Sequence, residues 1–305
     1  MNTNICKCSL GKQNTQGNSC PDLMQIAKRL IIVPKFKADG TVNEFANIAA
    51  VTKAALQAKF DAADIDDRFF PLSELKNVED LRGDTVFEEF TDRSKVKVDE
   101  NKRNFVGYII NQGSILFDKI KAWGCQEFGV YIIDKNSNFV YNTDSTLVKV
   151  QPIAVDANSW DIKLIKATDT EVEKIMISFD FAQNMRDENL RYLAAEDLDF
   201  DGLDTGDVYA LYDVNGVVSA ISTTGFTMTL TTDYGLPVKN LLITDFAVYN
   251  TTTAAAVTIV TMTETADGVY AFTFTAQTQS DVLQLTPTKS RYDFADVVSV
   301  AITIP

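Results

Sequence analysis

Residues 207–305 constrain the fold of this chain most strongly, because they consist of short runs in which apolar and polar residues alternate. The runs "FTMTLTT" (226–232) and "VYAFTFTA" (269–276) place threonine between apolar residues. Alternation with a period of two puts one set of side chains on each face of a β-strand. About seven or eight such runs within roughly 100 residues predict an all-β Ig-like sandwich.

Two dipeptides in this last third, Asn215-Gly216 and Asp267-Gly268, predict tight turns between strands. The same third contains neither cysteine nor tryptophan, so the disulfide and the buried tryptophan of antibody domains are missing. The resemblance to an Ig-like domain therefore rests on the strand pattern alone.

Residues 26–200 mix helical and strand patterns, which predicts an α+β N-terminal domain with a mainly antiparallel sheet. The segments that flank "KNSN" predict a hairpin. Ser114 is the expected N-cap of the second helix. We expect helices over residues 43–63, 114–125 and 184–195, and strands over residues 27–36, 104–111, 127–134, 138–143, 159–167 and 173–181.

A long charged segment, residues 61–104, interrupts this domain with short apolar islands such as "TVFEEF" and "KVKV". A stretch of this length with little core material is uncommon inside a compact domain. Two interpretations stay open. The segment is either a protruding strand pair that docks on neighbouring copies, or an ordinary solvated loop or exposed hairpin.

Histidine is absent from all 305 residues, which excludes Ser-His-Asp and Cys-His nucleophiles and any zinc site with imidazole ligands. Carboxylate, lysine, tyrosine or cysteine chemistry stays open, but we do not expect an enzyme or a cofactor. The net charge is −14 and no basic stripe marks a surface for holding nucleic acid. An acidic wall would instead let DNA slide past.

No apolar run is long enough to span a membrane, and no secretory signal opens the chain, so we expect synthesis in a cytoplasm. Three of the four cysteines, Cys6, Cys8 and Cys20, lie in the polar opening stretch, and the fourth is Cys125. Their spacing is unusual for zinc, and reducing conditions argue against a disulfide needed for folding. We interpret residues 1–25 as an extended N-terminal arm that lies on a neighbouring subunit, whether or not its thiols pair or bind metal.

The segment "EDLDFDGLDTGD" (196–207) contains the first half of a calcium loop, with acids at Asp197, Asp199 and Asp201 followed by glycine. The bidentate glutamate expected at the twelfth position is replaced by Val208. Calcium binding and a plain acidic turn between domains both remain open. The adhesion tripeptide Arg82-Gly83-Asp84 is too short to carry meaning alone.

The order of these parts resembles the ring-forming neck and tail structural proteins of tailed phages that infect Bacteroidetes, the crAss-like group in particular. The resemblance rests on "CKCSLGKQNTQGNSCPDLMQIAKRLIIVPKFKADGTVN", "VFEEFTDRSKVKVDENKRNFVGYIIN", "FGVYIIDKNSNFVYNT" and the terminal Ig-like region. It implies a virion protein, assembled in the host cytoplasm, that forms a dodecameric or hexameric ring. Neighbouring neck, portal or tail proteins would be its partners, and DNA would pass through its channel without sequence-specific binding.

The residues alone favour the same class, because a ring subunit needs a folded domain, head-to-tail contacts and protrusions that reach the next copy. The expected domains are thus an arm at 1–25, a ring-forming domain at 26–200 with a protrusion at 61–104, and an Ig-like domain at 207–305. A surface adhesin or glycan-binding protein that uses the Ig-like domain is the alternative. A glycosidase with paired carboxylates is a further one, although nothing places two acids across a cleft.

Overall fold

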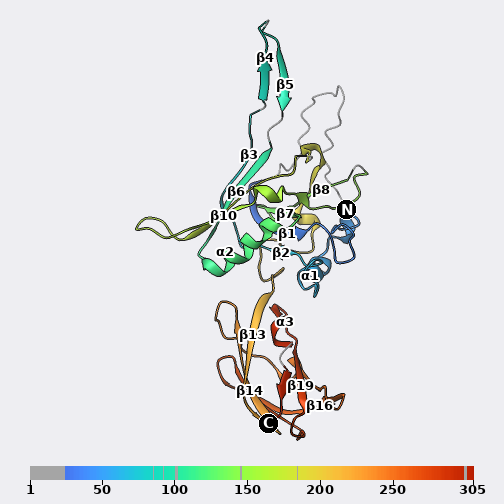
Figure 1. Cartoon of the computed structure of the whole chain (residues 1–305). Coiled ribbons are helices and arrows are strands. Elements are labelled where there is room, and N and C mark those ends of the chain that lie inside the picture. The colour runs from blue at the N-terminus through green and yellow to red at the C-terminus, as the bar shows by residue number, and fades with distance from the viewer. Residues whose placement is uncertain are drawn as a thin grey trace. The chain divides into compact units, whose positions relative to one another are not determined.

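The structure is a computed structural model that describes residues 25–305, apart from residues 85, 92, 100, 101, 145, 184, 299 and 300. It is mostly β, with several antiparallel sheets. The chain divides into two compact units at Ala210 and Leu211 (Figure 1). The N-terminal arm and its three cysteines, Cys6, Cys8 and Cys20, lie outside the described residues.

The first unit is built on a central antiparallel sheet whose strand β7 has every residue buried. The sheet runs in the order β12-β8-β7-β1-β2, and β9 pairs with β7. Its strands are β1 (Ala27–Pro34), β2 (Phe70–Pro71), β7 (Phe128–Asp134), β8 (Phe139–Asn142), β9 (Ile153–Ala154) and β12 (Leu190–Leu193).

A second antiparallel sheet of this unit runs in the order β10-β11-β6-β3. Its strands are β3 (Lys76–Arg82), β6 (Arg103–Ile110), β10 (Asp161–Ile165) and β11 (Lys174–Asp180). Val130 and Ile132 of the central sheet join Phe105 and Phe179 of the second sheet in one hydrophobic core. The two sheets therefore share that core.

The other face of the central sheet has a core of its own. Tyr131 and Phe139 contact each other there, with ring centroids 4.8 Å apart. Leu56 and Phe60 of helix α1 (Lys53–Phe60) join the same cluster, as does Val208. Burial on both faces explains why β7 reads as a continuous apolar run instead of an alternating one.

The helices are shorter than the sequence predicts. Within 43–63, the structure forms a 3₁₀ turn (Ile48–Ala50) and α1, whose N-cap Thr52 accepts a hydrogen bond from the backbone of Ala55. Phe45 bridges to Val150 instead, which keeps the start of this range extended. The helix expected over 114–125 is α2 (Gly113–Lys121) followed by a 3₁₀ turn (Ala122–Cys125).

Two local predictions about helices are wrong. Gln112, not Ser114, occupies the N-cap position of α2, and its side chain makes no capping bond. The helix expected over 184–195 is instead a 3₁₀ turn (Asp187–Asn189) followed by β12. The edge of β8 supplies backbone partners for this segment, as in the pairing of Tyr192 with Val140, and these tertiary hydrogen bonds override the helical spacing.

The second unit contains two further sheets, in the orders β17-β18-β14-β13-β20 and β16-β15-β19-β21. The described strands are β13 (Tyr212–Ser222), β14 (Gly225–Thr232), β15 (Phe246–Asn250), β16 (Ala255–Val257), β17 (Ile259–Ala266), β18 (Val269–Phe274), β19 (Val282–Pro287), β20 (Tyr292–Asp293) and β21 (Ala301–Thr303). A single helical turn, α3 (Ala295–Val298), precedes β21 in the chain.

One of the two predicted turns in this unit is confirmed and the other is wrong. Gly268 has a φ of +70° between β17 and β18, as a tight turn requires. Gly216 lies inside β13, where it pairs with Leu230. A Cβ at this position would lie 3.0 Å from a methyl group of Val297, so the glycine admits α3 close to the strand.

Candidate assembly surface

The middle of the charged segment forms a hairpin of β4 (Val86–Glu89) and β5 (Lys95–Asp99). In the described part of the chain these two strands pair only with each other. The turn is closed by hydrogen bonds from the backbone N–H of Phe90 to Ser94 O, 2.9 Å, and from Arg93 N–H to Phe90 O, 2.8 Å. We call residues 86–99 the β4–β5 hairpin.

Large apolar side chains of the β4–β5 hairpin face solvent. Phe87 is 56% exposed, Phe90 46% and Val96 53%. The register pairs Val96 with Glu88, the neighbour of Phe87, so Phe87 and Val96 lie on opposite faces of the ribbon. A hairpin without a third strand or a covering layer is marginally stable in water. Exposed aromatic residues on such a hairpin indicate a surface that another chain covers.

The hairpin leaves the second sheet where β3 ends and β6 begins, and an Arg–Asp cluster fixes this base. Arg103 donates from Nη2 to Asp80 Oδ2, 2.7 Å, and its Nε also bonds that carboxylate, so the pair is bidentate. Asp187 accepts from Arg103 Nη1 at 3.1 Å and from Arg82 Nη2 at 3.0 Å. Burial acts to lower the pKa of Arg103, but the bonds to Asp80 and Asp187 outweigh it and raise the pKa.

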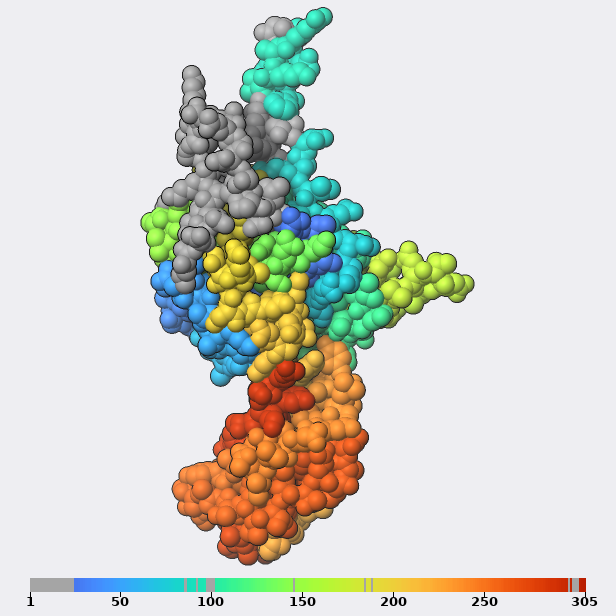
Figure 2. All heavy atoms as spheres, turned by 180° about the vertical axis from the view of Figure 1, so that it is seen from behind, coloured from blue at the N-terminus to red at the C-terminus, as the bar shows by residue number. Residues whose placement is uncertain are grey.

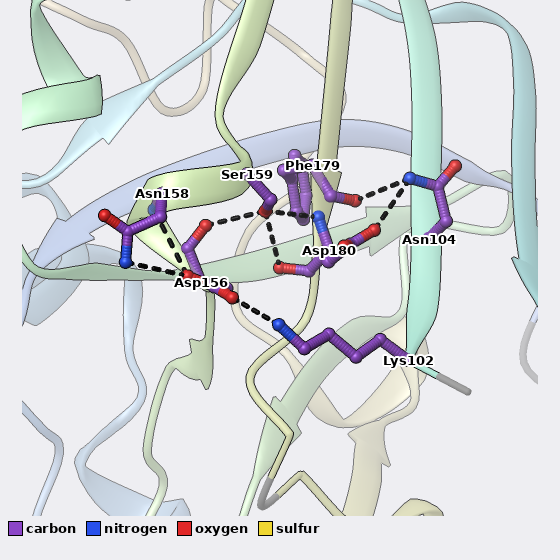
Figure 3. A network of polar contacts seen from close by, with 7 residues as sticks. All are labelled: Lys102, Asn104, Asp156, Asn158, Ser159, Phe179 and Asp180. Atoms are coloured by element: carbon purple, nitrogen blue, oxygen red, sulfur yellow. Dashed lines mark hydrogen bonds and ion pairs between the residues drawn. The ribbon is translucent and has the colours of Figure 1, made fainter. Parts of the chain in front are cut away.

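A second polar cluster holds the start of β6 from the side of β11 (Figure 3). The Lys102 ammonium bonds Asp156 Oδ2, and this contact raises the pKa of Lys102 and lowers that of Asp156. Asn104 donates to Asp180 Oδ1 at 3.0 Å, and the backbone N–H of Asp180 donates to Ser159 Oγ at 2.7 Å. The start of β6 is thus held by hydrogen bonds to β3 on one side and to β11 on the other.

A second protrusion, the turn at residues 166–173, leaves the same sheet from its other end. The register pairs the first residue of β11, Lys174, with the last residue of β6, Ile110. Arg82 instead pairs with Arg103, the first residue of β6. Figure 2 shows the 166–173 turn and the outer end of the β4–β5 hairpin standing clear of the body of the first unit. The turn carries an ion pair of Lys166 with Glu173, 3.1 Å.

The acidic segment 196–207 uses its carboxylates to bond neighbouring elements. Asp199 Oδ1 accepts the backbone N–H of Lys53, at the start of α1, at 2.6 Å. Asp201 Oδ1 accepts from Ser137 Oγ at 2.6 Å and from the backbone of Leu203 at 2.9 Å. Asp207 pairs with the Lys53 ammonium and accepts the backbone N–H of Asp201 at 2.7 Å.

These contacts lower the pKa of two acids in this segment. The hydrogen bond from Ser137, then that from Leu203, lowers the pKa of Asp201. The bond from Lys53, followed by the backbone N–H of Asp201, lowers the pKa of Asp207. The carboxylates point to protein donors, and across the described residues no group of three or more metal-ligating side chains is gathered.

The buried Arg29 side chain also donates hydrogen bonds to the acidic segment 196–207 and its neighbour Val208. The Arg29 side chain is 4% exposed and donates to Leu72 O at 2.9 Å, to Gly202 O at 2.8 Å and to Val208 O at 3.4 Å. Burial lowers the pKa of Arg29 to about 10, so the guanidinium is charged at neutral pH. Because Val208 is buried here, residues 207–210 belong to the first unit, whereas the sequence places residue 207 at the start of the second.

The remaining sequence-predicted residues are not gathered into one site. Cys125 is a free, exposed thiol at the end of the 3₁₀ turn that follows α2. Arg82 of the adhesion tripeptide is bonded to Asp187, and it ends a paired strand. Asp80, Lys102, Arg103 and Asp187 were not singled out from the sequence. For Asp80, Lys102 and Arg103, the sequence signal is the dense alternation of charge on both sides of the apolar islands. Asp187 lies in the segment where the sequence predicts a helix, so its contact with Arg103 could not be predicted.

Among the residues with assigned positions, no helix is long and apolar enough to cross a membrane. Comparisons with known proteins add no assignment. No protein-family model matches the chain, and no curated protein sequence matches it.

Proposed function

We propose that this chain is a structural subunit that associates with copies of itself into a ring, in the neck or tail of a tailed bacteriophage. The exposed β4–β5 hairpin is the observation that carries this proposal. Phe87, Phe90 and Val96 are large, apolar and about half exposed, while the base of the hairpin is held by ion pairs. A surface of this kind is stabilised when a neighbouring copy covers it.

The presence of two different protrusions supports a ring over a two-fold dimer. The β4–β5 hairpin and the 166–173 turn leave one sheet from opposite ends of β6. A protrusion that meets a different surface of the next copy makes a head-to-tail contact, and head-to-tail contacts close into rings when the rotation fits. A dodecamer or hexamer is the expected order.

In this proposal the first unit is the α+β ring-forming domain and the second is an Ig-like sandwich. Both sheets of the second unit contribute to one hydrophobic core, through Met228 and Leu230 of β14 and Leu283 and Leu285 of β19. Threonines of β14 alternate with these buried residues. Neighbouring neck, portal or tail proteins are the proposed partners, and the virion, assembled in the host cytoplasm, is the proposed location.

The charge balance suits a conduit for nucleic acid. The net charge of −14 repels polyanionic DNA, which would pass through the channel without sequence-specific binding. The proposed role is mechanical and requires no catalytic group or cofactor. The alternative of an adhesin receives less support, because all the phenylalanines in the core of the second unit, such as Phe226 and Phe272, are buried, and among the described aromatic residues of that unit only Tyr212 and Tyr249 are exposed.

Native mass spectrometry over a concentration series, with and without EDTA, tests this proposal. The wild-type chain is expected to form a closed oligomer of one fixed high order that EDTA does not dissociate. The triple variant F87S/F90S/V96S is expected to stay monomeric. A matched control, I65S/V260S, removes two exposed apolar side chains elsewhere and should assemble like the wild type. A wild-type chain that stays monomeric at every concentration would contradict the proposal.

A further inference from the structure

The two strands of the β4–β5 hairpin carry opposite charges. Strand β4 contains Glu88 and Glu89, whereas β5 contains Lys95 and Lys97. Glu89 and Lys95 are directly opposite in the register and form an ion pair of 3.3 Å, with both side chains more than half exposed. Strand β4 therefore carries two acids and no base, whereas β5 carries two lysines and one acid, Asp99, at its end.

Both outer edges of this ribbon are open. In the described part of the chain β4 and β5 pair only with each other, so each strand has backbone N–H and C=O groups directed away from its partner. An open edge is a template for pairing with a strand of another chain. Lysines on such an edge oppose pairing with a second lysine-rich edge, but they favour an acidic one.

We propose that the β4–β5 hairpins of adjacent copies join edge to edge, β4 of one copy against β5 of the next. This inference rests on the proposed self-association and specifies its contact. Glu89 of one copy then lies on the same face as Lys95 of its neighbour, at the distance of a direct cross-strand pair. Each hairpin gains a third and a fourth strand, which supplies the stability that an isolated pair lacks.

The charges select the symmetry of the contact. A two-fold dimer would pair β4 with β4, or β5 with β5, and would put strands of like net charge side by side. A cyclic arrangement repeats the order acidic strand, basic strand around the ring. Because β4 and β5 are antiparallel within a copy, rotation about a ring axis that runs along the strands also makes β5 antiparallel to the β4 of the next copy. The result is one continuous antiparallel sheet.

The apolar side chains fit the same arrangement. Phe87 lies on one face of the ribbon and Val96 on the other. In a continuous sheet every Phe87 faces the same side, and every Val96 the opposite side, so each gains neighbours from adjacent copies along its own face. The exposed residues of a single hairpin become two apolar rows that run around the assembly.

Charge reversal tests this contact. The variant E88K/E89K has two basic strands, and K95E/K97E has two acidic strands. Each alone is expected to raise the concentration needed for assembly by about tenfold or more. An equimolar mixture of the two variants restores acid against base at every interface, so native mass spectrometry should show an oligomer of alternating chains. The fourfold exchange E88K/E89K/K95E/K97E should assemble alone.

The mixture separates a contact between copies from damage within one hairpin. Each double variant also places like charges across its own ribbon, but the fourfold exchange restores the pairs within the ribbon as well. A matched control, E74K/E127K, reverses two exposed acids that pair with lysines elsewhere in the first unit, and it should assemble like the wild type.

Failure of this inference is distinguishable from failure of the proposed function. If the wild type does not self-associate, the proposed function fails and this contact fails with it. If the wild type assembles and both double variants assemble equally well, the ring stands but the edge-to-edge contact is wrong. Double variants that fail alone and fail equally when mixed would also contradict it.

Discussion

Two hairpins of this chain, β7–β8 and β4–β5, have the same topology and opposite surroundings. The residues of β7 are all buried between two layers of core. Phe87 and Val96 of β4–β5 face solvent on opposite sides of the ribbon. Packing within the chain stabilises the first hairpin, whereas the second has exposed apolar surface, which in the proposed ring a neighbouring copy covers.

Under the proposed function, the difference separates the residues needed for folding from those needed for assembly. The ion pairs of Arg103 and Lys102 stabilise the end of the second sheet from which the hairpin extends. The exposed hairpin therefore extends from a stable base. Loss of an apolar side chain should therefore harm folding in one hairpin and association in the other.

The largest expected effect contrasts Phe139 of β8 with Phe87 of β4. Phe139→Ala removes a fully buried ring and should lower the free energy of unfolding by about 3–5 kcal/mol. Phe87→Ala should change it by less than about 0.5 kcal/mol in the monomer, because that ring is exposed. Urea denaturation at a concentration below assembly measures both. Equal losses in the two variants would break the comparison.

A smaller loss is expected at Arg29, which supports the buried side of the molecule. Arg29→Met leaves the carbonyl oxygens of Leu72 and Gly202 without their buried donor, which should cost about 2–3 kcal/mol. Assembly of the folded fraction should be unchanged, since Arg29 lies in the core and not on the hairpin. Stability equal to the wild type would show that water replaces the guanidinium.

Acid should weaken both the base of the exposed hairpin and the acidic segment. Asp156 and Asp201 have folded-state pKa values below the ordinary value of 3.8. Their contribution to stability is present above the unfolded pKa and is lost as the pH falls through the folded pKa. Denaturation at a series of pH values between 5 and 2 gives the free energy of unfolding at each pH. This free energy should decline less with falling pH in D156N and D201N than in the wild type. A decline identical to that of the wild type would contradict these assignments.

The smallest expected effect is that of calcium. Because Asp199, Asp201 and Asp207 accept hydrogen bonds from protein donors, millimolar Ca²⁺ should leave the melting temperature unchanged. Calorimetry with Ca²⁺ and with EDTA measures this. A higher melting temperature in Ca²⁺ would mean that the segment opens and binds the ion.

The sequence predicts well those elements whose local pattern agrees with their tertiary environment. The β7–β8 hairpin around "KNSN" is confirmed, as is the alternation of β14. The charged segment contains a strand pair, which fits both of its interpretations, since one is a protruding strand pair that docks and the other includes an exposed hairpin. Its docking on another copy stays a prediction.

Predictions fail where a distant part of the chain decides the structure. The segment at 184–195 has helical spacing but pairs with β8. Gly216 belongs to a turn-forming dipeptide but lies inside β13, where α3 packs too closely for a side chain. The partners of Asp201 and Asp207 also come from distant positions, Ser137 and Lys53. No local pattern contains these contacts, so a calcium loop and a structural turn look alike in sequence.

Hydrogen–deuterium exchange of the two hairpins, at concentrations below and above assembly, tests the central claim most directly. The account predicts slow exchange for β7–β8 amides at both concentrations. Amides of β4–β5 should exchange fast in the monomer and slow strongly on assembly. Fast exchange of β4–β5 in the assembled oligomer would contradict the claim that neighbouring copies meet through this hairpin.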